Sequence, residues 1–292
     1  MSRNMQSLLQ WAIANSDPEQ LSTQAQQPPS ERPNYTINRE LIDAVLGKDD
    51  PTRMREAADI IASPSSSFDA RLAALEELQE LVEQIDNACN LENMQLWPLV
   101  LKQLQAEEPE IRAMGAWCCG SALQNNPRAQ KAFLKAGGLE ALMPLLEDES
   151  QEVKAKAVGC VSGSVRNCQE ALREFEDRNG WALLAQLLVE GQASVVRKVV
   201  FLYQNVMLDE ENVSARLWEE GMAVGLERVL REFQDDEDLV AKSLRTLHTF
   251  LKQQHANVTV PSSLKECVQE VRQKYTESEL DDNEWKELDQ WL

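Results

Sequence analysis

Apolar residues along this chain recur at helical spacing, and the helical pattern itself repeats about every 42 residues. One column of equivalent apolar positions consists of Ile111, Val153, Val195 and Leu239. Four residues after each of these come Gly115, Ala157, Val199 and Ser243. The small members of this second column predict that helices approach closely in a stack, and Val199 fits that prediction less well.

A third column has the same period and consists of Gly138-Leu139, Gly180-Trp181 and Gly221-Met222. Each pair opens a second apolar run such as LEALMPLL or WALLAQLL. A period of roughly 40 to 47 residues with two or three helices per unit is typical of armadillo and HEAT repeats. The pattern therefore predicts an all-α, armadillo/HEAT-like, right-handed superhelical solenoid whose concave face binds a partner.

The same pattern divides the chain into segments. We predict an N-terminal amphipathic segment over residues 1–16, a flexible linker rich in Gln, Pro and Ser over 17–36, and a helical cap over 37–67. Repeats then fill residues 68–275, with units at 68–106, 107–149, 150–190, 192–234 and 236–275. The acidic tail, residues 276–292, carries Trp285, Leu288 and Trp291 on one helical face, so it either caps the array or hangs free.

Charge narrows the choice of partners. The formal net charge is −20, and an acidic surface repels phosphate backbones and anionic lipids. We therefore expect neither nucleic acid nor a membrane as a partner. The six cysteines form no CxxC motif, which favours reduced thiols in the cytoplasm. No signal peptide or membrane span is predicted, and a solenoid needs no second copy, so a monomer is expected.

Candidate catalytic groups are scarce, and we predict that the chain is not an enzyme and holds no metal or cofactor. His248 and His255 are the only histidines, and neither has a recognisable catalytic partner by spacing. The string GCVSGS at 159–164 resembles a nucleophile elbow only loosely, because its glycine precedes Ser162 by three residues and its context is helical.

Polar residues at equal register are the candidates for the concave face. Lys156, Lys198 and Lys242 align, and Arg197 adjoins Lys198. Two interpretations stay open: ordinary solvated lysines, or a cationic lane that orients an acidic partner surface. Asn125 and Asn167 align near the ends of their helices, where they either contact a partner backbone or form turns.

Four strings resemble the fungal Fes-type nucleotide exchange factors and their animal relatives, the Hsp-binding-protein family. They are LLQWAIANS at 8–16, DDPTRMREA at 49–57, IDNACNLENMQLWPLV at 85–100 and QNNPRAQ at 124–130. The resemblance implies an armadillo-type cochaperone that grips the ATPase domain of a cytosolic heat-shock 70-kDa chaperone. ADP then leaves, ATP enters and the client protein is released. The alternative is an armadillo-type adapter or scaffold for another partner.

The resemblance also implies contact residues. They are Asp86, Asn87, Ala88 and Asn90 in one segment, and either Lys198 or Arg197 in another. Ala88 is expected to be a small residue that lets the chaperone approach closely.

The N-terminal apolar residues support a separate hypothesis. Leu8, Leu9, Trp11 and Ile13 look like the short apolar peptides that such chaperones bind, so on a tether they would compete with client. Docking against the first helices of the array is the alternative.

Overall fold

The computed structural model describes residues 47–292 except 211, 255–257, 276–279 and 281. The chain divides into two compact units, residues 1–56 and 57–292, and only residues 47–56 of the first are described. The predicted amphipathic segment and linker therefore lie outside the described residues. Within residues 47–56, Lys48 pairs with Glu56 at 2.6 Å across the first turns of a helix.

The described residues are helical throughout, with no strand among them. The helices are α4 (Asp50–Ala62), α5 (Phe68–Leu81), α6 (Ile85–Asn93), α7 (Trp97–Gln103), α8 (Pro109–Leu123), α9 (Pro127–Lys135), α10 (Gly138–Leu142), η1 (Met143–Glu147), α11 (Gln151–Val165), α12 (Gln169–Asp177), α13 (Gly180–Glu190), α14 (Ala193–Asp209), α15 (Val213–Glu219), α16 (Met222–Glu232), α17 (Glu237–Gln253), α18 (Ser262–Lys274) and α19 (Asp282–Trp291). The prediction of an all-α solenoid is confirmed.

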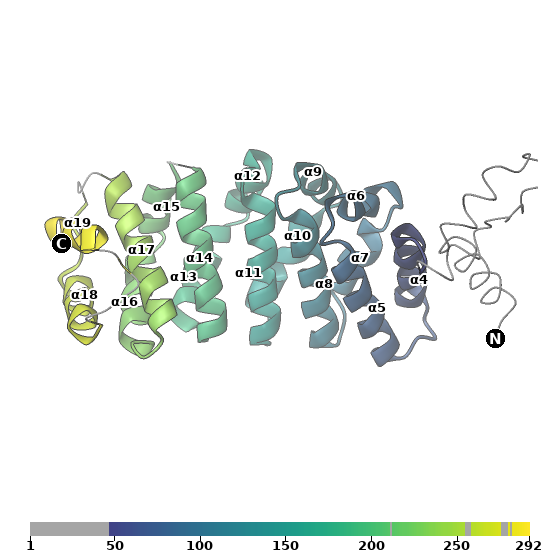
Figure 1. Ribbon diagram of the computed structural model, residues 1–292, viewed down its shortest axis with the longest axis horizontal. Helices are drawn as coiled ribbons and strands as arrows, with labels where there is room; N and C mark the ends of the chain where they lie inside the picture. The colour runs from purple at the N-terminus through teal and green to yellow at the C-terminus, as the bar shows by residue number, and fades with distance from the viewer. Residues whose placement is uncertain (1–46, 211, 255–257, 276–279, 281) are drawn as a thin grey trace, which may run out of the picture. The chain divides into compact units, whose positions relative to one another are not determined.

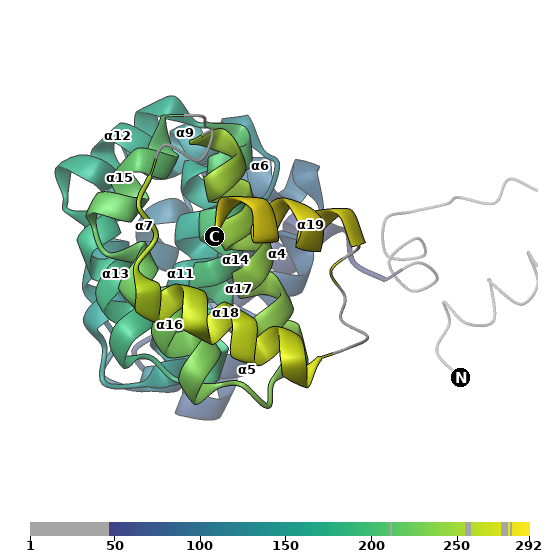
Figure 2. The same ribbon diagram turned by 90° about the vertical axis from the view of Figure 1, so that its left-hand side faces the viewer.

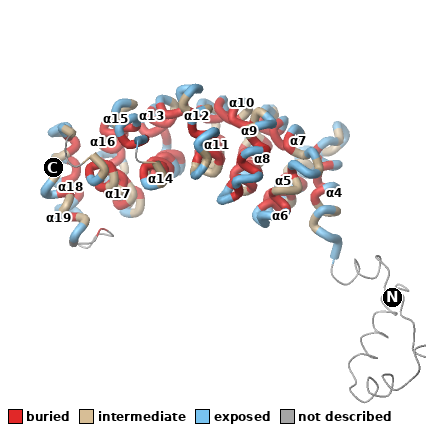
Figure 3. The backbone as a smooth tube through the Cα atoms, turned by 90° about the horizontal axis from the view of Figure 1, so that it is seen from above, coloured by how far each residue is buried: buried red, intermediate tan, exposed pale blue. Residues whose placement is uncertain are grey.

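Within residues 57–292 the helices stack in repeats (Figure 1). The long helices α5, α8, α11, α14 and α17 pack in succession, each against the next. Seen from above, the unit is an arc, and these long helices follow its concave side, whereas α7, α10, α13 and α16 follow the convex side (Figure 3). Side chains at equal register on the long helices therefore come together on one concave face.

Left-handed residues start the outer helices. Gly137, Asn179 and Gly221 have φ values of 76°, 57° and 97° and immediately precede α10, α13 and α16. Gly221 is therefore equivalent to Gly137 and Asn179, and its sequence alignment with Gly138 and Gly180 was wrong by one residue. The shift arises because glycine supplies two different properties here, a positive φ in one position and an absent side chain in the next.

Gly138 and Gly180 are needed for space. A Cβ atom added at Gly138 would lie 2.4 Å from the ring of Phe133, and one added at Gly180 would lie 2.3 Å from the ring of Phe175. Both rings are fully buried. In the next repeat the equivalent pair is Leu217 and Met222, where a smaller neighbour leaves room for a side chain.

The close approach of α8 and α11 depends on two other glycines. A Cβ added at Gly120 would lie 3.2 Å from the Cα of Cys160, and one added at Gly163 would lie 3.1 Å from the carbonyl oxygen of Gly120. A Cβ added at Gly115, which the sequence pattern singled out, would lie 3.2 Å from the Cβ of Gln103 in α7. Gly115 therefore also lies at a close approach between helices, that of α7 and α8.

The C-terminal helix α19 caps the array and packs against α17 (Figure 2). Leu288 is fully buried and Trp285 is 9% exposed. Glu287 accepts a hydrogen bond from His248 at 2.7 Å, and Glu284 pairs with Arg245 at 3.7 Å. Of the two sequence interpretations of the tail, the structure shows the capping one. No helix in the described part of the chain is both long and apolar enough to span a bilayer.

We expect Gly180→Ala to destabilise the array, because the added methyl group overlaps the Phe175 ring. Overpacking of this kind costs about 1–3 kcal/mol. The measurement is the urea midpoint of unfolding followed by circular dichroism. Combining Gly180→Ala with Phe175→Leu imitates the natural Leu217–Met222 pair and should recover part of the loss. If the double variant loses as much stability as the two single variants together, the steric explanation is wrong.

Candidate functional site

Two columns of residues on the inner helices form the concave face. One column consists of Met114, Lys156, Lys198 and Lys242. The second, one helical turn later, consists of Trp117, Gly159, Phe201 and Arg245. Trp117 is 40% exposed and Phe201 is 49% exposed, so this column presents two large apolar side chains to solvent. The first column was predicted from the sequence and the second was not, although it lies at a constant spacing of three residues after the first.

Lys156 and Lys198 lie on adjacent helices and repel each other. The Nζ atom of Lys156 sits 3.2 Å from the centroid of the Trp117 ring. Partial burial, and then the charge of Lys198, lower the pKa of Lys156 below its usual value. Neither lysine forms an ion pair with any carboxylate in the described residues. These two cations are therefore available to an anionic partner.

Lys242 differs from the other two lysines of its column. It forms an ion pair with Asp238 one turn earlier on α17. Further along α17, Arg245 pairs with Glu284 of α19. The predicted cationic lane is thus available over α11 and α14 and neutralised by internal carboxylates over α17.

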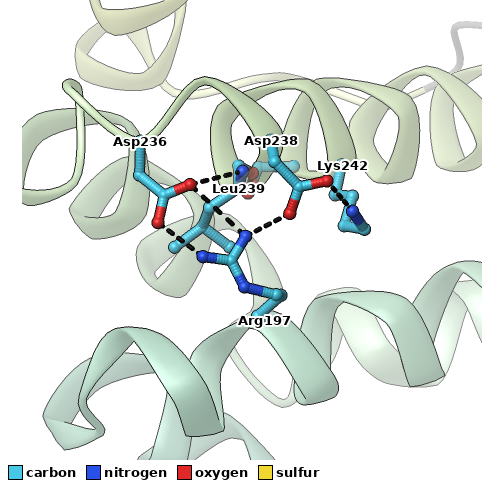
Figure 4. A network of polar contacts seen from close by, with 6 residues as sticks. Arg197, Asp236, Asp238, Leu239 and Lys242 are labelled. Atoms are coloured by element: carbon cyan, nitrogen blue, oxygen red, sulfur yellow. Dashed lines mark hydrogen bonds and ion pairs between the residues drawn. The ribbon is translucent and has the colours of Figure 1, made fainter.

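Arg197 belongs to an ion network that joins two repeats (Figure 4). Its Nη2 lies 2.5 Å from Oδ2 of Asp236, and its Nη1 contacts Asp238. Asp236 also caps α17 by accepting a hydrogen bond from the backbone N–H of Leu239 at 3.1 Å. Arg197 thereby fastens α14 to the start of α17, while its neighbour Lys198 is exposed.

The network shifts the pKa values of both aspartates downward. Partial burial opposes ionisation of Asp236, but hydrogen bonds from Arg197 and from Leu239 outweigh it and lower its pKa. The hydrogen bond from Lys242 is the main reason that the pKa of Asp238 is lowered. Both carboxylates are therefore held in their charged form in the folded protein.

The α6 segment holds four of the contact residues that the resemblance implies. Ala88 is only 2% exposed and Asn87 only 6%, and the Asn87 side chain donates a hydrogen bond to the carbonyl of Leu81 at 3.1 Å. These two side chains face the interior, because α6 turns its apolar side toward the array. A bulky group at Ala88 would first meet the protein's own packing. Of the four residues implied by the resemblance, Asp86 is exposed and Asn90 is half-buried, so these two are open to a partner.

Asn125 and Asn167 occupy turns after α8 and α11. Their φ values are 51° and 54°, in the left-handed region that asparagine tolerates better than most residues. Both also line a recess of about 480 Å³ on the concave side, together with Gln124, Pro127, Gln130, Gly159, Ser162, Gly163, Arg166 and Phe201. The structure therefore gives both residues a turn role and places them at the rim of a recess.

Groups suited to catalysis do not converge in the described residues. No cluster of three or more His, Cys, Asp or Glu side chains there is suited to hold a metal ion. His248 is only 8% exposed and is engaged by Glu287, whereas His255 lies outside the described residues. Cys118 is fully buried, and burial raises the pKa of its thiol well above the usual value, which keeps it protonated and unreactive.

Comparison with known families identifies two matching stretches. The sequence profile described as nucleotide exchange factor Fes1 matches residues 5–91. The profile described as the SIL1/FES1/HPBP1 C-terminal domain matches residues 87–229. Together they span the N-terminal segment and most of the array.

Individual relatives agree with these profiles. The Hsp70 nucleotide exchange factor fes1 of Schizosaccharomyces pombe is 30% identical over 239 residues, which cover 80% of this chain and 83% of that protein. The Hsp70 nucleotide exchange factor FES1 of Saccharomyces cerevisiae is 36% identical over 148 residues, which cover 49% of each chain. The chain thus spans most of the first relative and about half the length of the second.

Solved structures share the fold. A designed armadillo repeat protein in complex with the peptide (KR)4 superposes with a TM-score of 0.62 at 17% identity, covering 82% of this chain and 97% of that one. Computationally designed armadillo repeat proteins for modular peptide recognition give a TM-score of 0.62 at 16% identity, covering 82% and 98%. At such low identity the likeness concerns the armadillo fold alone.

We expect Arg197→Gln to lower the free energy of unfolding by about 1 kcal/mol at neutral pH, since it breaks a partly exposed ion network. The pKa values of Asp236 and Asp238 are lowered by folding, so the network's contribution is complete above the ordinary aspartate pKa of about 4. The contribution is lost as pH falls through the lowered folded-state values. Urea unfolding of both proteins at several pH values should show a difference that shrinks below about pH 4.

Lys198→Gln is the matched control, because it removes the neighbouring charge without touching the network. It should leave the unfolding midpoint nearly unchanged. Equal destabilisation by both substitutions would contradict the distinction between them.

Proposed function

Since the chain belongs to the Fes1 family of Hsp70 nucleotide exchange factors, we propose that its concave face binds the ATPase domain of an Hsp70 chaperone and promotes release of ADP. ATP then enters and the client protein is released. The observation that supports this assignment is the pair of lysines, Lys156 and Lys198, which lie beside exposed aromatic side chains and form no ion pair with a carboxylate of the described residues. Such a surface suits an acidic protein partner with apolar groups near its charges.

Binding energy alone is sufficient for this activity. A factor that promotes ADP release binds the nucleotide-poor state of the chaperone more tightly than the ADP-bound state. By linkage, nucleotide then weakens the factor by the same ratio. A hundredfold coupling corresponds to about 2.7 kcal/mol, a modest share of the free energy of a protein interface. No catalytic side chain is required, so the proposed function is that of a cochaperone and not of an enzyme.

The segment around α6 would provide a second contact. Of the residues that the resemblance implies there, Asp86 and Asn90 are the accessible ones. The buried Asn87 and Ala88 would act by holding α6 in place. On the inner helices, Lys198 would contact the chaperone while Arg197 keeps α14 and α17 in register.

We further propose a cytoplasmic monomer. All six cysteines are free, which agrees with a reducing compartment. Each repeat buries its apolar side against its neighbours, and α19 covers the C-terminal end of the array. The second unit therefore presents no exposed end at α17 that would call for another copy.

Residues 1–16 would act separately from the array. Their apolar side chains would occupy the client site of the chaperone, with residues 17–36 as the tether, and thereby displace client. Docking of the same residues against the array is the competing possibility.

We expect the protein to accelerate release of a fluorescent ADP analogue from Hsp70, and the double variant Lys156→Glu with Lys198→Glu to weaken this. Reversing two charges that face an acidic surface should slow association by about tenfold or more at low ionic strength. Stopped-flow fluorescence measures both effects. Lys102→Glu, an exposed lysine on the outer helix α7, is the control and should behave as wild type. If the wild-type protein leaves ADP release unchanged, the proposed function is wrong.

Deleting residues 1–36 should separate the two proposed activities. ADP release should stay at the wild-type rate, because the array is intact, while release of a labelled client peptide should slow. Fluorescence anisotropy of the peptide reports the second step. Unchanged client release would favour docking of this segment on the array over competition with client.

A further inference from the structure

Gly159 lies in the interior of α11, where its missing side chain is not explained by the packing of the protein. Glycine in a helix interior costs stability relative to alanine, so its presence there calls for a physical reason. Gly120 and Gly163 have one, because an added Cβ at either would crowd the partner helix at 3.2 Å or 3.1 Å. A Cβ at Gly159 would meet no described atom within 4 Å.

The position of Gly159 suggests that reason. At equal register on the neighbouring inner helices stand Trp117 and Phe201, both large and both substantially exposed. Gly159 thus interrupts an aromatic column on the concave face. With Gly163 it lines the recess of about 480 Å³ that Phe201, Asn125 and Asn167 also border.

The recess is held in shape by contacts beneath it. The side chain of Gln130 is 3% exposed and donates hydrogen bonds of 2.9 Å to the carbonyl oxygens of Gly163 and Arg166. Arg166 in turn pairs with Asp209 at 2.8 Å, which ties the end of α11 to the end of α14. A site fixed in this way loses little conformational entropy when a partner enters it.

We infer that this recess receives an apolar side chain from a helix or loop of the Hsp70 ATPase domain, flanked by a carboxylate that meets Lys156 and Lys198. This inference rests on the proposed function. The absence of a side chain at Gly159 makes room for the incoming group, and Phe201 supplies an apolar wall. Glycine at this position lowers the stability of the helix but permits close approach of the partner.

The charges select the class of occupant. Lys156 and Lys198 stand one helical turn before Gly159 and Phe201, and so lie on the same face beside the recess. Lys156 feels the charge of Glu152 one turn earlier on α11, but neither lysine forms an ion pair with a carboxylate of the described residues. Two mutually repelling ammonium groups of this kind disfavour a basic side chain and favour an acidic one. An apolar residue with an acidic neighbour matches both the recess and the lysines.

The test replaces Gly159 with tryptophan, which fills the recess with the side chain found at the equivalent position 117. Affinity for nucleotide-free, full-length Hsp70 is measured by calorimetry with the full-length protein. We expect at least about a tenfold loss of affinity, with a melting temperature no lower than that of wild type. Ala182→Trp, which adds the same indole at an exposed position on the outer helix α13, is the matched control and should bind normally.

Two further variants protect the test against an artefact of the bulky side chain. Gly159→Ala should raise the melting temperature by favouring the helix and yet weaken binding, a combination that damage to the fold would not produce. Phe201→Ala removes a half-exposed wall and should also weaken binding, with only a small loss of stability because half of the side chain is already exposed.

The outcomes separate the two proposals. If wild-type protein fails to bind Hsp70 and to accelerate ADP release, the proposed function is wrong and the inference falls with it. If wild-type protein binds but Gly159→Trp and Phe201→Ala bind equally well, the recess is not part of the interface and only this inference is overturned.

Discussion

Burial between successive repeats is the constraint on which the rest of this structure depends. No single core exists, so each long inner helix is stabilised by the ones on either side. Glycines bring α8 and α11 together where backbone meets backbone. Ion pairs then join successive repeats, as Arg71 with Glu108, Arg166 with Asp209 and Arg197 with Asp236, while Arg112 with Asp148 joins the two ends of one repeat. A partner that pushes on one inner helix therefore pushes on a connected stack.

The stacking also determines what the concave face offers. Because inner helices are side by side, each register position becomes a column of side chains, and the chemistry of the face changes from repeat to repeat along a column. The lysine column is available over α11 and α14 but is neutralised over α17 by Asp238. One helical turn further along α17, Arg245 forms an ion pair with Glu284 of α19. The cationic surface is thus confined to the middle of the array, beside the recess.

Sequence reasoning predicted the fold well because the fold depends on periodic apolar residues. The column of Ile111, Val153, Val195 and Leu239 is fully buried, as its spacing indicated. Reasoning about the site was weaker where the decisive contact lies in another repeat. Arg197 and Lys198 are adjacent in sequence, yet only the former reaches Asp236, 39 residues later. The burial of Ala88 likewise depends on how α6 is rotated, which its short sequence does not determine. The sequence also contains the column of Trp117, Gly159 and Phe201. It becomes informative only when a glycine at a register position otherwise held by aromatic residues is treated as a signal.

A glycine without a structural requirement is informative in this protein because the other glycines each have one. Gly138 and Gly180 make room for Phe133 and Phe175, and Gly137 supplies a left-handed turn. When every other requirement for glycine is met by geometry inside the protein, a position without such a requirement indicates contact with something outside it. Gly159 is such a position, and it adjoins two lysines that form no ion pair within the described part of the chain. One partner surface can fill the space beside Gly159 with an apolar side chain and place a carboxylate at the two lysines. A single interface therefore explains both features.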